Sequence, residues 1–131
     1  MGYNCEILNM LQERSVVKVA DNSGAKVVRV FRILGGSRKK YAHLGEVVVA
    51  SVQQAEPRKS VKKKDIVRCL VIRTAQPTRR ADGSYVRFDE NAVVLIDPKK
   101  QPLATRIFGP IPREIKEKGF ELIFSLAEEI V

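Results

Sequence analysis

The stretch Thr78–Ile96, TRRADGSYVRFDENAVVLI, contains two turns and the strands that they connect. Asp82-Gly83 predicts a hairpin, because the left-handed backbone of a type I′ turn suits that pair of residues. Asp89–Asn91 predicts a second turn, and Ala92–Ile96 after it is apolar on both faces. The stretch is therefore typical of an antiparallel meander in a β-rich domain.

Arginines occur in this meander at positions where a sheet does not require them. Between the two turns, Val86 and Phe88 alternate with Arg87, so the apolar pair is expected to face the core and Arg87 to face outward. Arg79 and Arg80 stand side by side just before the first turn. We interpret these three arginines as surface charge that serves binding.

The rest of the chain continues the β-rich pattern and changes near its end. Four runs rich in Val and Ile predict further strands: Ser15–Ala20, Ala25–Leu34, Glu46–Val52 and Ile66–Arg73. Imperfect alternation in the second run is typical of a strand that bulges or twists along a barrel. Ile111-Pro112 opens a predicted short helix that stops at Gly119, and Phe120–Ala127 predicts a second one. A chain of 131 residues is long enough for one domain, here mainly β with five or six strands and a short helical C-terminal segment.

The net charge of +9 is concentrated on the body of the chain. Residues 14–113 contain 22 Lys/Arg and 8 Asp/Glu, whereas the two ends are mildly acidic. A polyanion is the natural partner of such a body, because each neutralised phosphate releases condensed counterions. The alternative is a basic surface that serves only solubility.

Two dense basic loops fall between predicted strands. Gly35–Gly45 reads GGSRKKYAHLG, and Pro57–Lys64 reads PRKSVKKK with five basic residues in eight positions. Their place between strands predicts protruding β-ribbons, and Tyr41 adds aromatic area to the first cluster. Such density favours nucleic-acid binding over the alternative, charge that keeps strand edges from pairing. The absence of Trp and the 6% aromatic content argue against a stacking platform for single strands, so structured RNA fits better.

Enzyme, metal and cofactor chemistry find little support in the sequence. His43 is the only histidine, and neither a P-loop nor a G-x-S-x-G pattern occurs. Cys5 and Cys69 form no C-x-x-C pair, and Cys69 lies in the apolar run IVRCLVI, where a small core residue is expected. The sequence has no apolar run of transmembrane length and no signal-peptide pattern at its start. We therefore predict a non-enzymatic cytoplasmic protein that needs no metal or cofactor.

Four segments give a specific resemblance: Val19–Lys26 (VADNSGAK), Leu34–Glu46 (LGGSRKKYAHLGE), Val71–Ile96 and Thr105–Ile115 (TRIFGPIPREI). In these segments the chain resembles the family of the large-subunit ribosomal protein numbered fourteen, of the bacterial or organellar type. The resemblance covers residues 10–131 and makes residues 1–9 an N-terminal extension. It implies a small five-stranded β-barrel, expected over about residues 10–104, and a helical segment over about residues 105–131.

The resemblance also implies a function as a structural constituent of the large ribosomal subunit, in a cytoplasmic or organellar ribosome. Members bind large-subunit rRNA, contact small-subunit rRNA in intersubunit bridges, and pair with a neighbouring ribosomal protein. A ribosomal silencing factor docks on the family, which makes Thr105, Arg106 and Arg113 candidate protein contacts here. The candidate RNA contacts are Arg38, Lys39, Lys40, Tyr41, Arg58, Lys59, Lys62, Lys63, Lys64, Arg79, Arg80 and Arg87. The alternative function is a free-standing basic β-barrel that regulates transcripts by binding RNA.

Overall fold

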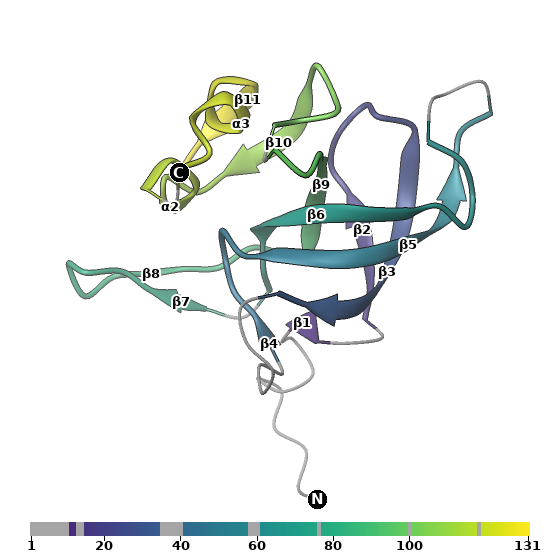
Figure 1. Ribbon diagram of the computed structural model, residues 1–131. Coiled ribbons are helices and arrows are strands. Elements are labelled where there is room, and N and C mark those ends of the chain that lie inside the picture. Colours follow the sequence, from purple (N-terminus) through teal and green to yellow (C-terminus); the bar gives the residue numbers. More distant parts are fainter. Residues whose placement is uncertain are drawn as a thin grey trace, which may run out of the picture.

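Five strands close into a barrel at the centre of the molecule (Figure 1). The computed structural model describes residues 11–12, 15–34, 41–57, 61–75, 77–99, 101–117 and 119–131. The barrel strands are β2 (Val16–Val19), β3 (Ala25–Ile33), β5 (Val47–Ala55), β6 (Ile66–Arg73) and β9 (Ala92–Ile96). Neighbours pair antiparallel in that order, and parallel pairing of β9 with β2 closes the barrel. The predicted five-stranded barrel in a mainly β chain is confirmed.

Alternating small aliphatic side chains fill the barrel interior. In β5, Val48, Ala50 and Val52 are fully buried, whereas the residues between them are partly exposed. Against β5, β3 shifts register between Val30 and Arg32, so the irregularity predicted from its imperfect alternation is confirmed. Each fully buried valine contributes about 1.5–3 kcal/mol to folding. The interior therefore stabilises the strands from which the loops project.

The residues Cys69–Ile72 of β6 and all of β9 are buried on both faces, because a second core lies outside the barrel. Cys69 and Val71 belong to the barrel interior, whereas Leu70 and Ile72 belong to the second core with the C-terminal segment. This arrangement explains why the two strands are apolar at nearly every position. Burial raises the pKa of the Cys69 thiol, and its prediction as a small core residue is confirmed.

The C-terminal segment covers this outer face with two short helices between two strands (Figure 1). Its elements are β10 (Ile107–Ile111), α2 (Glu114–Glu117), α3 (Glu121–Ser125) and β11 (Ala127–Ile130). The two predicted helices are present but shorter than expected. The first does not open at Ile111-Pro112, because Ile111 is the last residue of β10 and pairs with Ile130 of β11. The prediction of helix through Ala127 is wrong for the same reason, since Ala127 begins β11, which runs parallel to β10.

Two further pairs of short strands lie outside the barrel in the described parts of the chain. β1 (Leu11–Gln12) pairs with β4 (Tyr41–Ala42), and β7 (Thr78–Arg79) pairs with β8 (Tyr85–Val86). The β7–β8 ribbon projects from the side of the barrel in Figure 1. The hairpin predicted at its tip is therefore confirmed.

The turn of this ribbon differs from the type I′ geometry that the sequence suggests. A type I′ turn needs positive φ at both central residues, but Gly83 has a φ of 90° and Asp82 is not in that region. The N–H of Gly83 donates to the carbonyl oxygen of Arg80 (3.0 Å), and the Asp82 carboxylate accepts from the Ser84 hydroxyl (2.6 Å). The hairpin is thus a longer loop with a single left-handed glycine.

The apolar side chains of the ribbon do not reach the core. Val86 and Phe88 are half-buried and belong to neither of the two core clusters. Their predicted role as core residues is wrong, because the ribbon leaves the barrel before the chain returns in β9.

Candidate nucleic-acid interface

The turn between β5 and β6 presents three consecutive lysines, Lys62–Lys64, to solvent. Asp65 fixes the turn, because its carboxylate accepts a hydrogen bond from the backbone N–H of Lys62 (2.9 Å). Lys64 is left-handed, with a φ of 73°, and its N–H donates to the carbonyl oxygen of Val52 (2.8 Å). In the described part of the chain, the three ammonium groups form no ion pair. The backbone of the turn is therefore held in place while its charges face outward.

The β7–β8 ribbon presents an arginine beside an aromatic ring. Arg79 is the cross-strand partner of Tyr85, and both side chains are exposed. Arg87, two positions after Tyr85, is also exposed, so the outward face predicted from alternation is confirmed. A guanidinium can fork onto a phosphate, and a neighbouring ring adds flat contact area, so this face is suited to a nucleic-acid backbone.

Arg80 turns in the opposite direction, toward the C-terminal segment. Its Nε donates to Oε1 of Glu114 (2.6 Å), and a terminal nitrogen donates to Oε2 (3.3 Å) and to the backbone oxygen of Val131 (2.9 Å). The side chains of Arg80 and Glu114 are 15% and 21% exposed. These charge-assisted hydrogen bonds engage Arg80 inside the protein, and its role as an RNA contact stays a prediction.

The other predicted RNA contacts fall partly outside the described residues. Tyr41 is half-buried in β4, opposite Gln12. Five predicted contacts lie outside the described residues and stay predictions: Arg38, Lys39, Lys40, Arg58 and Lys59.

Outward-facing cations on the barrel wall extend the basic surface beyond the predicted contacts. Arg29 and Arg32 on β3 and Arg68 on β6 are exposed. Arg32 and Arg68 are both in register with Val49, one on each side of β5. The sequence signal for them is their position between apolar strand residues, which a search for dense basic loops overlooks.

The predicted protein contacts lie on the exposed side of the C-terminal segment. Asn22, in the loop after β2, binds the start of this segment. Its side-chain oxygen accepts hydrogen bonds from the backbone N–H groups of Thr105 (3.0 Å) and Arg106 (3.2 Å). The Arg106 guanidinium lies 5.8 Å from the ring centroid of the exposed Phe108. Arg113 is exposed. This cation-and-ring surface is chemically suited to a protein partner, and its role stays a prediction.

A buried carboxylate supports the loop that carries Asn22. Asp21 accepts hydrogen bonds from the Leu95 N–H (2.9 Å) and the Ser23 hydroxyl (2.6 Å). Burial raises the pKa of Asp21, and these hydrogen bonds oppose the rise. The residue is enclosed by its own partners, so its role is structural.

The described residues contain neither a candidate metal site nor a candidate membrane-spanning helix. In those ranges, no group of three His, Cys, Asp or Glu side chains lies close enough to hold a metal ion. In the same ranges, no helix is both long enough and apolar enough to cross a membrane.

The fold and its charge define a class: a small basic β-barrel that projects hairpins and carries a C-terminal segment of two short helices between two strands. Comparison with known families then gives the assignment. The chain matches the Ribosomal protein L14p/L23e family over residues 10–131 and belongs to it. It is therefore a structural, non-enzymatic protein of the large ribosomal subunit.

Proposed function

We propose that this chain binds large-subunit rRNA through its basic hairpins and outer barrel wall. The observation that carries the proposal is exposed positive charge: Lys62–Lys64 and Arg79 face solvent without an intramolecular ion pair among the described residues. Phosphates are the expected partners of such charges, and structured RNA is recognised mostly by shape and backbone contacts. The domain is expected to act as one unit over residues 10–131.

We further propose that the C-terminal segment faces other components of the ribosome. Thr105, Arg106 and Arg113 are exposed on this segment together with the ring of Phe108, and this chemistry fits a neighbouring ribosomal protein or a silencing factor. Contacts of the chain with small-subunit rRNA would contribute to intersubunit bridges. Family membership favours this role over a free-standing RNA-binding regulator. The same reasoning applies in a cytoplasmic or an organellar ribosome.

Sedimentation of the tagged full-length chain tests the proposal. The chain is expected to co-migrate with large subunits through a sucrose gradient and to be released only at high salt, because phosphate contacts weaken as salt rises. A variant with Arg79→Ala and Arg87→Ala is expected to leave the particles at lower salt. Lys18→Ala is the matched control, because Lys18 already pairs with Glu90 (2.9 Å). A chain found only in the light fractions at low salt contradicts the proposal.

A further inference from the structure

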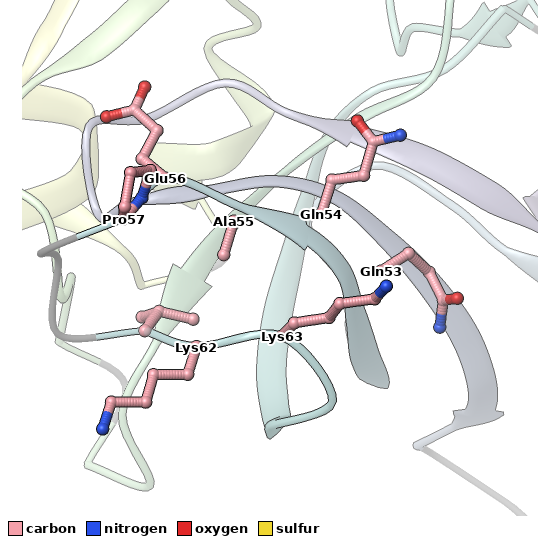
Figure 2. Close-up of a pocket in the computed structure, with 8 residues that line it drawn as sticks. Gln53, Gln54, Ala55, Glu56, Pro57, Lys62 and Lys63 are labelled. Atoms are coloured by element: carbon pink, nitrogen blue, oxygen red, sulfur yellow. The ribbon is translucent and has the colours of Figure 1, made fainter.

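An open pocket of about 480 Å³ lies between the end of β5 and the segment that leads into the lysine turn (Figure 2). The strand supplies Gln53, Gln54, Ala55, Glu56 and Pro57, and the facing segment supplies Val61, Lys62 and Lys63. A volume of this order lies within the range of pockets that bind small ligands. It is far larger than a bare phosphate needs.

The walls and the rim of the pocket have different chemistry. Ala55, Pro57 and Val61 supply apolar surface, and Val61 is only 7% exposed because it also packs against the barrel core. In Figure 2, Ala55 points into the space between the two segments. A flat apolar ring system would remove this surface from water.

Charge at the rim is favourable for an anion. Lys63 extends along the pocket toward the part of β5 that carries Gln53, whereas Glu56 points to the other side of the strand (Figure 2). The acidic side chain among the lining residues is therefore directed away from the space that a phosphate would occupy. The lysine supplies a cation for the ribose-phosphate backbone at the mouth.

Gln53 adds hydrogen-bonding capacity at the end of the pocket that Lys63 reaches (Figure 2). Its Nε2 donates to the Ser51 hydroxyl (2.9 Å), which fixes the orientation of the amide. The amide keeps a second N–H and a carbonyl oxygen, and this pair of groups complements the N7 and N6 positions of adenine.

We propose that this pocket receives one unstacked nucleotide of large-subunit rRNA, with its base against Ala55 and Val61 and its phosphate near Lys63. Sequence-specific contacts to RNA are made mostly at bases that leave the stack, which is the chemistry that this pocket offers. The inference rests on the proposed rRNA binding and deepens it, because it assigns a base contact to a hairpin that otherwise offers only charge.

Acylation of RNA 2′-hydroxyls in isolated large subunits tests the proposal. One nucleotide is expected to be unreactive in particles that hold the wild-type chain and at least tenfold more reactive with Ala55→Leu, which fills the pocket. Lys18→Ala is the control, because Lys18 is not among the residues that line the pocket and pairs with Glu90, so the protection should stay intact. Gln53→Glu is a second probe with almost unchanged volume. It adds a negative charge near the phosphate and should expose the same nucleotide.

The outcomes separate this inference from the proposed function. If the wild-type chain is absent from large subunits, the rRNA-binding role itself fails. If both pocket variants enter the particles at wild-type occupancy and give the wild-type reactivity profile, the pocket proposal is overturned and the rRNA-binding role stands. A profile in which Lys18→Ala exposes the nucleotide as strongly as Ala55→Leu also overturns it.

Discussion

Two basic hairpins leave the barrel, and they use their charge in different ways. The β5–β6 turn keeps Lys62–Lys64 exposed around a backbone held by Asp65. In the β7–β8 ribbon the two arginines differ, since Arg79 faces solvent and Arg80 forms an ion pair with Glu114. The density of basic residues in a sequence is thus a poor measure of the charge available to a ligand. What decides availability is the tertiary position of the nearest carboxylate.

The largest effect on stability is expected when Arg80 loses its side chain. Arg80→Ala leaves Glu114, which is largely buried, without its partner, and should lower the free energy of unfolding by about 2–3 kcal/mol. Arg79→Ala, the matched control one position away, should change it by less than about 0.5 kcal/mol. Urea denaturation measures both values. Equal changes in the free energy of unfolding for the two variants would show that the Arg80–Glu114 ion pair does not stabilise the fold.

A substitution in the lysine turn should move stability and RNA affinity in opposite directions. Lys64→Gly removes the strain of a left-handed non-glycine residue, so the free energy of unfolding should rise by about 0.5–1 kcal/mol. The same change removes one exposed charge and should weaken binding to large-subunit rRNA. Denaturation and filter binding measure the two quantities. Lys64→Ala serves as the control, because it removes the charge and keeps the strain.

The smallest expected effect is a pH dependence at the tip of the ribbon. Hydrogen bonds from Ser84, first through its hydroxyl and then through its N–H, hold the pKa of the exposed Asp82 below its usual value. Because the folded pKa is depressed, these hydrogen bonds are fully present above the ordinary Asp pKa and are lost as pH falls through the depressed one. An NMR titration of the Ser84 amide should therefore show a midpoint below 3.8. A midpoint at or above that value would mean that the turn does not form in solution.

The sequence predicts the barrel well and the C-terminal segment less well, for a physical reason. Barrel strands can be recognised from local sequence, since buried residues such as Val48 and Val52 alternate with partly exposed neighbours. Strand β11 has no such signal, because Glu129 and Ile130 are both exposed and only the pairing with β10 defines the strand.

The candidate site shows the same division between local and tertiary information. Arg79 and Arg80 are indistinguishable in the sequence, and a carboxylate 34 residues away gives them different roles. The pocket beside Ala55 was likewise not predictable, because it depends on how β5 meets the segment at Val61.

The most direct test of the contrast between the hairpins is the salt dependence of binding to purified large-subunit rRNA. The double variant Lys62→Ala/Lys63→Ala should reduce the slope of log affinity against log salt by about 1.4–1.8, since each lost phosphate contact removes about 0.7–0.9. Arg80→Met, measured at a temperature where circular dichroism shows it folded, should keep the wild-type slope. An unchanged slope for the lysine variant together with a reduced slope for Arg80→Met would contradict the assignment of charge described above.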